Sequence, residues 1–123
     1  MKIAFFEIHD WEKETFKKQL SHHELKFFDV PLSQQNASQV SHFDVLSVFI
    51  YSKVNNDLIK KLRNVKLIVT RSMGYDHIDL SSCKKANIIV SNVPHYGDSS
   101  VAEHAFALIL SISRNIHKAY LRT

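Results

Sequence analysis

The sequence predicts an α/β protein built on a mainly parallel sheet of five strands. Five short stretches of apolar residues recur along the 123 residues, and patterns of helical periodicity separate them. Strands that are buried on both faces of a parallel sheet are almost continuously apolar, as these stretches are. Strands that alternate with helices along a chain pair in parallel, and ligands then bind beyond the carboxyl ends of the strands.

The first strand and the first helix lie at the start of the chain. Residues 2–8 form an apolar run with the length of a buried strand. Asp10 can cap the helix that follows, because its carboxylate can accept hydrogen bonds from the free N–H groups of the first turn. Trp11, Phe16 and Leu20 recur at helical spacing and are expected to form the apolar side of this helix.

A polar segment separates the second strand from the third. Residues 25–30 form the second strand, and Pro31 stops it because proline cannot donate to a strand ladder. Residues 31–42 are rich in Ser, Gln and Asn, which indicates a loop or a weak helix. The third strand, residues 44–50, is again apolar and is expected to be buried.

Two short helices and two strands complete the predicted sheet. Asn55 or Asn56 caps the first of these helices. Residues 66–71 and 87–91 form strands four and five, and a short helix beginning at Asp79 joins them. Five strands that alternate with helices indicate the flavodoxin-like variety of parallel sheet. The residues expected to face inward from the two helices are Leu58, Ile59, Leu62, Leu80 and Cys83.

The last helix is predicted to begin at Ser100. Ser100 and Glu103 have the spacing of a capping box, in which each side chain binds the backbone N–H of the other residue. Residues 105–110 are apolar on every side, and a helix that is apolar all round is buried all round. We therefore expect a second domain or a second subunit to cover this helix.

Composition and charge argue against several classes of function. The 16 Lys and Arg residues give a net charge of +4 but are scattered rather than gathered in a stripe, which argues against nucleic-acid binding. Eight histidines occur without metal-ligand spacing, so no metal site is predicted. The one cysteine, Cys83, fits a reducing compartment. No apolar run has the length of a signal peptide or a membrane span, so we expect a cytoplasmic protein without membrane contact.

Two segments of the chain resemble a known enzyme family. TRSMGYDHIDL (residues 70–80) and SNVPHYGDSSVAEHAFALIL (residues 91–110) resemble the NAD-dependent D-2-hydroxyacid dehydrogenases, and within them the D-lactate dehydrogenase branch. The resemblance is tight from about Lys66 to Arg114 and colinear upstream. It implies an oxidoreductase that moves a hydride between NAD and a small 2-keto or D-2-hydroxy acid, such as pyruvate or D-lactate, in a full-length enzyme that is a homodimer.

The same resemblance implies how the chain is organised. Residues 1–98 would be the N-terminal portion of a flavodoxin-like substrate domain, and residues 99–123 a crossover helix toward a missing NAD-binding Rossmann domain. The Rossmann fingerprint G-x-G-x-x-G does not occur, because the only glycines are Gly74 and Gly97. The family's catalytic Arg, acidic residue and His also follow the crossover helix. We therefore predict a fragment that is inactive alone, contains no catalytic residue and leaves most NAD contacts to the missing domain.

The turn after the fourth strand is the first part of the predicted substrate site. Gly74 would let backbone N–H groups approach a carboxylate, although a simple turn also uses glycine. By resemblance, the backbone at Met73 and Gly74 holds the substrate carboxylate, and Met73 either approaches the nicotinamide or fills a gap. Ser72 either binds the ligand or caps the turn. Arg71 is assigned a structural role rather than that of a carboxylate clamp.

Residues from three other loops complete the predicted site. Tyr96 follows the fifth strand, and by resemblance its ring and hydroxyl line the substrate pocket. Tyr51 closes the third strand on the same rim, and an aromatic substrate contact of the family aligns with Val54. Val101, at the start of the last helix, is either a neighbour of the nicotinamide or a core residue.

A non-enzymatic binding module of the same fold is the alternative, for example a phosphoacceptor receiver domain. A receiver needs clustered acidic residues after the first strand and an aspartate at the end of the third. Here the third strand ends at Tyr51 and Ser52, which argues against this alternative.

Overall fold

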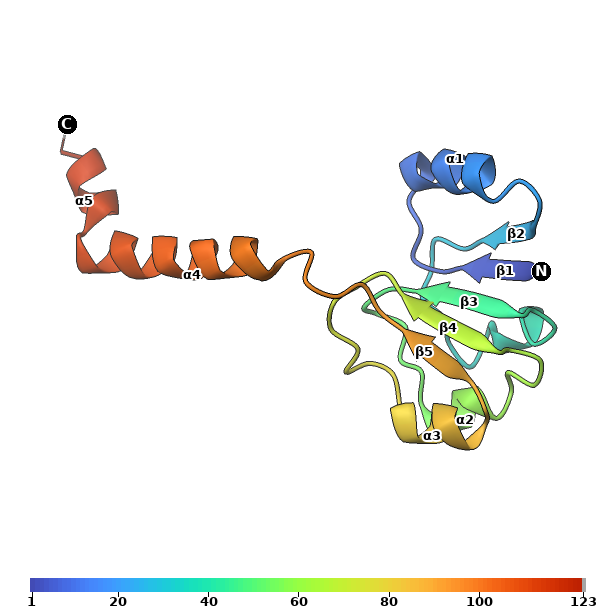
Figure 1. The fold of residues 1–123 in the computed structure, drawn as a ribbon. Coiled ribbons are helices and arrows are strands. Elements are labelled where there is room, and N and C mark those ends of the chain that lie inside the picture. The colour runs from blue at the N-terminus through green and yellow to red at the C-terminus, as the bar shows by residue number, and fades with distance from the viewer. Residues whose placement is uncertain (123) are drawn as a thin grey trace.

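The computed structural model describes residues 1–122 and confirms the five-stranded parallel sheet. The strand order is β2-β1-β3-β4-β5, and every neighbouring pair of strands is parallel. This order places β1, β3 and β4 inside the sheet and β2 and β5 at its edges (Figure 1). The strands are β1 (Lys2–Phe5), β2 (Glu24–Phe27), β3 (Val45–Val48), β4 (Leu67–Thr70) and β5 (Ile89–Ser91).

Helices lie on both faces of this sheet. α1 covers one face, and α2 and α3 cover the other (Figure 1). Two further helices follow β5 and extend away from the sheet (Figure 1). The helices are α1 (Asp10–Gln19), the 3₁₀ turn η1 (Ala37–Gln39), α2 (Asn56–Ile59), α3 (Leu80–Lys85), α4 (Asp98–Ser113) and α5 (Ile116–Tyr120).

The hydrophobic core is divided between the two faces of the sheet, because successive residues of a strand point to opposite faces. Ile3 and Phe5 of β1 belong to a smaller cluster on the side of α1, where Phe16 packs against them. Ala4 belongs to a larger cluster that also contains Leu58 of α2 and Cys83 of α3. The alternation within a single strand therefore holds helices on both sides of the sheet.

Several details of the first strand and helix differ from the prediction. The strand ends at Phe5, and Glu7 beyond it has a left-handed backbone conformation (φ 54°), which is incompatible with continued strand geometry. α1 is capped at His9 rather than at Asp10, and the Glu12 carboxylate accepts a hydrogen bond from the His9 N–H at 2.9 Å. Trp11 does not face the sheet, because its side chain is 77% exposed.

The short helices α2 and α3 agree better with their sequence signals. Asn55 caps α2, and its side-chain oxygen accepts a hydrogen bond from the Leu58 N–H at 3.0 Å. Asp79 caps α3, and Cys83 is buried as predicted. The prediction for Leu80 is wrong: it is the first residue of α3 and its side chain is exposed.

The start of α4 differs from the predicted capping box. The helix begins at Asp98 with Gly97 as its N-cap. Ser100 therefore already lies in the first turn and cannot be the capping residue. The predicted capping box of Ser100 and Glu103 is wrong, because the helix is capped at Gly97, three residues before Ser100.

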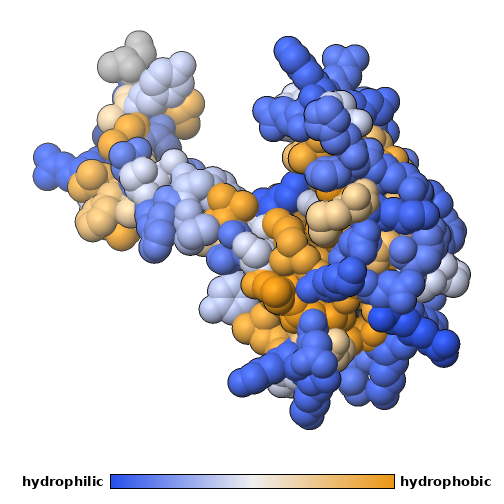
Figure 2. Space-filling model, turned by 45° about the vertical axis from the view of Figure 1, so that its right-hand side comes forward, coloured by the Kyte–Doolittle hydropathy of each residue, from blue (hydrophilic) through white to orange (hydrophobic). Residues whose placement is uncertain are grey.

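The long terminal helix is also interrupted. Asn115 has a left-handed conformation (φ 52°), and it separates α4 from α5. α4 and α5 together, residues 98–120, are called the helical arm below; Thr123 lies outside the described residues. No residue of the arm is buried, so residues 1–122 do not supply the cover that its apolar sequence predicts. Figure 2 shows apolar surface on the arm and on the body that carries the sheet.

Candidate functional site

The site is built at the carboxyl edge of the sheet, where the loops after four strands lie together. Because all five strands are parallel, the segments after β1, β3, β4 and β5 leave the sheet at the same edge (Figure 1). This is the edge at which open α/β sheets bind ligands. The residues predicted from sequence to form a site, apart from Val101 on α4, all belong to three of these four loops.

A row of hydrogen bonds fixes the turn after β4. The Ser72 hydroxyl donates to the Gly74 carbonyl oxygen at 2.7 Å, so its own oxygen is left to accept. It lies 2.6 Å from the Thr70 hydroxyl, which therefore donates to it. The Thr70 oxygen lies 3.2 Å from His77 Nε2, which then carries the proton of a neutral ring. Burial lowers the pKa of His77, which favours that neutral form.

The loop after β5 supports the same turn from the other side. The Asn92 side-chain amide donates to the Met73 carbonyl oxygen at 2.8 Å. The Val93 N–H donates to the Ser72 carbonyl oxygen at 3.1 Å. The turn is thus held by its own Ser72 and by the loop after β5. The carbonyl oxygens of Ser72, Met73 and Gly74 all accept hydrogen bonds.

The N–H groups of the turn are left free. Within residues 1–122, the backbone N–H groups of Met73 and Gly74 donate to no protein acceptor. Two adjacent free N–H groups at the end of a strand can bind an anion such as a carboxylate. Gly74 itself has no left-handed conformation, and a Cβ there would meet only Asp76 Oδ2, at an ordinary 3.7 Å. Neither backbone strain nor crowding within these residues explains the glycine.

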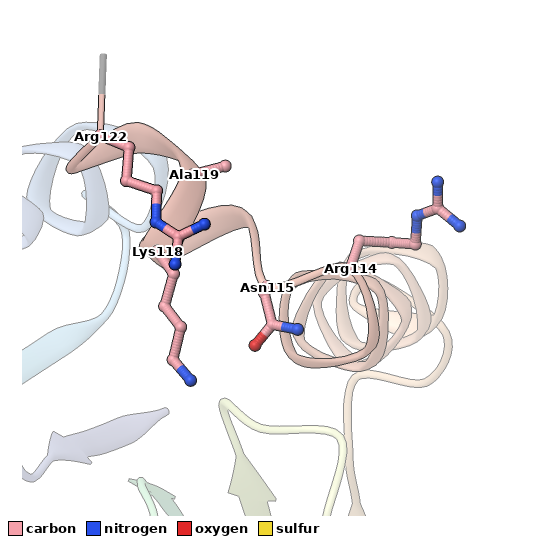
Figure 3. A pocket seen from close by; sticks show the side chains of 5 residues that line it. All are labelled: Arg114, Asn115, Lys118, Ala119 and Arg122. Atoms are coloured by element: carbon pink, nitrogen blue, oxygen red, sulfur yellow. The ribbon is translucent and has the colours of Figure 1, made fainter.

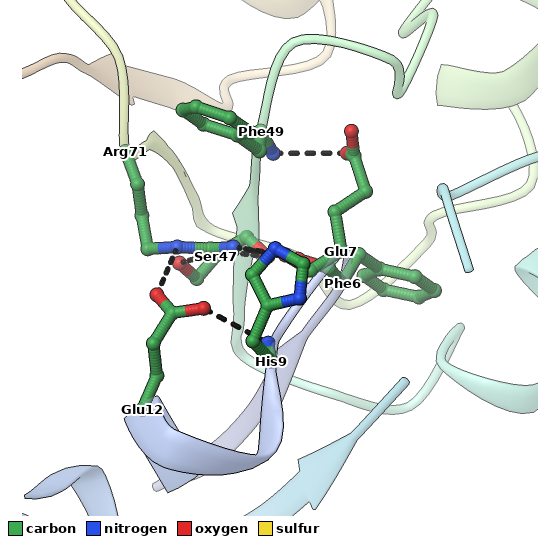
Figure 4. Close-up of polar contacts among 7 residues, drawn as sticks. All are labelled: Phe6, Glu7, His9, Glu12, Ser47, Phe49 and Arg71. Carbon is green, nitrogen blue, oxygen red and sulfur yellow. Dashed lines mark hydrogen bonds and ion pairs between the residues drawn. The ribbon is translucent and has the colours of Figure 1, made fainter. Parts of the chain in front are cut away.

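Arg71 has the structural role that was predicted for it. Its Nη2 donates to the carbonyl oxygens of Phe6 at 3.0 Å and Glu7 at 2.7 Å (Figure 4). Its Nη1 donates to the Ser47 hydroxyl at 3.2 Å, and its Nε lies 3.8 Å from a Glu12 carboxylate oxygen. Burial lowers the pKa of the guanidinium, and the charges of Glu12 and Glu7 oppose that effect. Arg71 ties β4 to the ends of β1 and β3 and is not free to clamp a ligand.

Glu7 is a structural residue that the sequence reasoning missed. Its carboxylate accepts hydrogen bonds from the Phe49 N–H at 3.0 Å and the Tyr51 N–H at 2.7 Å, and it also bonds the Ser52 hydroxyl. The Ser52 oxygen in turn accepts from the Leu32 N–H at 2.9 Å. Glu7 is only 8% exposed. The available signal was an acidic residue inside an otherwise apolar run, which indicates a buried carboxylate with several donors around it.

The remaining predicted site residues lie in different surroundings. Tyr51 and Tyr96 are 71% and 64% exposed and stand on the rim of the edge. Val101 is exposed on α4, so it is not a core residue within the described chain. Val54 is 1% exposed and belongs to the larger core cluster, with its backbone paired to Ile78. Its side chain is therefore not available to a ligand, and its prediction as a substrate contact is corrected.

The polar groups around Arg71 border a hollow of about 370 Å³. The hollow lies where the ends of β1, β3 and β4 meet the start of α1 and the loop after β5. Three aromatic residues take part in its wall, each from a different segment of the chain. Its lining residues are Glu7, His9, Trp11, Glu12, Phe49, Arg71 and Tyr96.

A second hollow, of about 330 Å³, lies at the junction of α4 and α5. Arg114, Lys118 and Arg122 line it together with Asn115 and Ala119. The three cationic side chains do not converge on a common point (Figure 3). All five residues are exposed, so this junction lacks the buried polar wall of a formed ligand site.

Residues 1–122 contain no group of three or more His, Cys, Asp or Glu residues arranged to hold a metal ion. None of the helices among these residues is long and apolar enough to cross a membrane.

The fold and the carboxyl-edge turn define a doubly wound α/β protein with two free backbone N–H groups after β4. Comparison with known proteins then gives the family. The catalytic-domain model of the D-isomer specific 2-hydroxyacid dehydrogenases matches residues 3–120, and the chain belongs to that family.

Three relatives illustrate the match. "2-hydroxyacid dehydrogenase homolog 1" of Schizosaccharomyces pombe is 36% identical over 99% of this chain and 38% of its own length. D-lactate dehydrogenase of Escherichia coli is 30% identical over 100% of this chain and 39% of its own. The structure of D-lactate dehydrogenase from Aquifex aeolicus, complexed with NAD and lactic acid, superposes with a TM-score of 0.89 at 34% identity, over 98% of this chain and 36% of that one. The chain thus spans less than two-fifths of the length of these relatives.

Proposed function

We propose that this chain forms the substrate-binding part of an NAD-dependent D-2-hydroxyacid dehydrogenase. The reaction interconverts a small 2-keto acid, such as pyruvate, and the corresponding D-2-hydroxy acid. The single observation that carries the proposal is the pair of free N–H groups at Met73 and Gly74, on a turn fixed from two strands in a chain of this family. The Aquifex aeolicus relative bound to NAD and lactic acid supports the same reaction class.

Each predicted residue has a distinct task in this proposal. The N–H groups of Met73 and Gly74 donate to the substrate carboxylate, and Ser72 positions them by holding the turn. Tyr96 and Tyr51 stand on the rim and limit the space beside the substrate. Ser72 is a positioning residue rather than a direct ligand, because its hydroxyl proton is already given to Gly74.

The cofactor is expected to contact this chain only at its margin. When bound, NADH supplies the hydride that adds to C2 of the keto acid, and a proton added to the carbonyl oxygen completes the hydroxy acid. Met73 and the exposed Val101 are the residues of this chain that could meet the nicotinamide. The chain has two glycines, far apart, and therefore no glycine-rich loop for the pyrophosphate, which other residues of the enzyme would hold. A cytoplasmic homodimer is the expected form of the whole enzyme.

The alternative of a phosphoacceptor receiver domain receives no support from the geometry. Such a domain needs a free acidic side chain at the ends of β1 and β3. The Glu7 carboxylate is occupied by three donors from the end of β3, and Ser52 is fully buried.

The experiment that tests the proposal uses the protein encoded by the whole gene. We expect it to oxidise NADH in the presence of 2-keto acids. We expect Asn92→Ala to raise the KM for pyruvate about tenfold with a smaller change in kcat, because the turn that receives the carboxylate loses a support. Asn64→Ala, at an exposed asparagine outside the carboxyl edge, is the matched control. Absence of any 2-keto acid reductase activity in the folded wild-type protein would refute the proposal.

A further inference from the structure

The side chains of His77, Thr70 and Ser72 form a continuous series of hydrogen bonds along the turn after β4, called the hydroxyl row below. Thr70 is the last residue of β4, and His77 follows seven residues later on the far side of the loop. The contact of 3.2 Å between His77 Nε2 and the Thr70 hydroxyl therefore closes this loop. Both hydroxyl groups belong to buried residues, where a polar group needs a partner.

The direction of the hydroxyl row determines what its first member must supply. Each hydroxyl group has one proton to donate. The proton of Ser72 goes to the Gly74 carbonyl oxygen, and that of Thr70 goes to Ser72. Only a donor can then pair with the Thr70 oxygen, and His77 Nε2–H is that donor. A side chain without an N–H or O–H group at position 77 would leave the row without its first donor.

His77 is itself attached to the core of the domain. Its carbonyl oxygen accepts a hydrogen bond from the Val54 N–H at 2.8 Å, and the Asp79 N–H donates to the Val54 carbonyl oxygen at 2.9 Å. Val54 is buried in the larger core cluster. The imidazole ring thus extends from a segment of fixed backbone, and the hydroxyl row connects that segment to the turn.

The free N–H groups of the turn are aimed by the bonds that their own peptide groups make. A peptide group is planar and trans, so its N–H and its C=O point to opposite sides. The Ser72 carbonyl shares a peptide group with the Met73 N–H, and the Val93 N–H binds that carbonyl. The Met73 carbonyl shares one with the Gly74 N–H, and the Asn92 amide binds it. The hydroxyl row binds the carbonyl of the next peptide group, at Gly74, so the pair of N–H groups lies between fixed neighbours.

We propose that His77 is a positioning residue for the carboxylate of the substrate. As the first donor of the hydroxyl row, it fixes the Gly74 carbonyl and thereby holds the N–H groups of Met73 and Gly74 in one orientation. The proposal rests on the proposed function above, in which these two N–H groups bind the carboxylate. His77 acts through Thr70 and Ser72 and does not touch the substrate.

The test separates positioning from a purely structural role in the protein encoded by the whole gene. We expect His77→Leu to raise the KM for pyruvate about fivefold with a smaller change in kcat, the usual effect of losing one supporting hydrogen bond. The dissociation constant of oxamate, a carboxylate that cannot be reduced, should rise by the same factor in a calorimetric titration with NADH present. His77→Gln keeps an N–H donor and should restore both constants. His22→Leu, at an exposed histidine outside the carboxyl edge, is the matched control.

A double-variant comparison tests whether the hydroxyl row acts as a unit. Thr70→Val cuts the row at its second member and keeps the shape of the side chain. We expect the double variant of Thr70→Val and His77→Leu to have the same KM for pyruvate as Thr70→Val alone, because the row is already interrupted. Multiplied effects of the two substitutions would overturn the row.

The outcomes separate this proposal from the one on which it rests. A folded His77→Leu variant with a lower melting temperature but the wild-type KM, or a His77→Gln variant as impaired as His77→Leu, overturns the positioning role and leaves the dehydrogenase assignment intact. Failure of the folded wild-type protein to reduce any 2-keto acid overturns both. If His77→Leu does not fold, Thr70→Val alone decides, since a wild-type KM in that variant also overturns the role.

Discussion

At the end of β1, the single carboxylate of Glu7 organises the end of β3. It binds two backbone N–H groups and one hydroxyl, all more than forty residues away in the chain. Its backbone carbonyl accepts from Arg71, which connects the same point to β4. Because these contacts fix the backbone of Phe49 and Tyr51, Glu7 shapes the carboxyl edge of the sheet.

Replacing this carboxylate is predicted to destabilise the fold. In Glu7→Gln, one oxygen becomes an NH₂ group that faces a donor, so a buried N–H or O–H is left without an acceptor. We expect the free energy of unfolding to fall by about 2 kcal/mol. Urea unfolding followed by circular dichroism measures this difference. Glu14→Gln on the exposed side of α1 is the matched control, and equal losses in the two variants would contradict the role given to Glu7.

Among the helices, α3 shows how one cap can make stability depend on pH. The Asp79 carboxylate accepts from the Ser82 N–H at 3.0 Å, from the Ser82 hydroxyl at 2.5 Å and from the Ser81 hydroxyl at 2.8 Å. These hydrogen bonds to the charged form lower the pKa of Asp79 from 3.8 to about 2. α3 covers the sheet beside β5, and its cap lies at the end of the β4 loop.

The sign of the pH effect follows from the lowered pKa. The unfolded chain binds a proton at Asp79 more readily than the folded chain, so the stabilisation is complete above the ordinary pKa and is lost as pH falls toward about 2. In Asp79→Asn, the cap cannot titrate. We therefore expect the stability advantage of the wild type over Asp79→Asn to shrink as pH falls from about 5 to about 3. Urea midpoints at the two pH values check this, and a difference that stays constant would contradict it.

The helical arm carries apolar side chains that residues 1–122 leave exposed. Its sequence is apolar on all sides, and its large side chains, such as Phe106 and Ile109, are exposed. Among residues 1–122, the only substantial packing partner of α4 is α5. The arm therefore adds apolar surface to the molecule and contributes little to the stability of the sheet.

At the scale of the whole molecule, this separation predicts that the sheet folds without the arm. We expect residues 1–97 to show the same urea midpoint as residues 1–123, because no core residue lies in the arm. We also expect residues 1–123 to self-associate with rising concentration and residues 1–97 to remain monomeric, since the exposed apolar surface is removed. Size-exclusion chromatography and circular dichroism measure both properties. Loss of the native circular dichroism spectrum in residues 1–97 would show that the arm is part of the folding unit.

The sequence by itself determined the fold class, the family and the turn after β4. These depend on local patterns: apolar runs of strand length, caps such as Asn55, and the continuous motif from Thr70 to Leu80. A local pattern is readable because the residues that create it are neighbours in the chain. The boundaries of the arm were harder to read, since Gly97 and Ser100 are both acceptable capping residues and only the backbone decides between them.

Only the tertiary structure decided which side chains reach the site. Glu7 is buried although it is acidic, and Val54 is buried although it was predicted to contact the substrate. Trp11 is exposed although it was predicted to lie on the apolar side of α1. The physical reason is distance along the chain: Glu7 finds its donors 42 to 45 residues away, and the wall of the hollow combines segments from residues 7 to 96. Helical periodicity places Trp11 on a helix, but the packing of the strand ends determines whether sheet or solvent lies beside it.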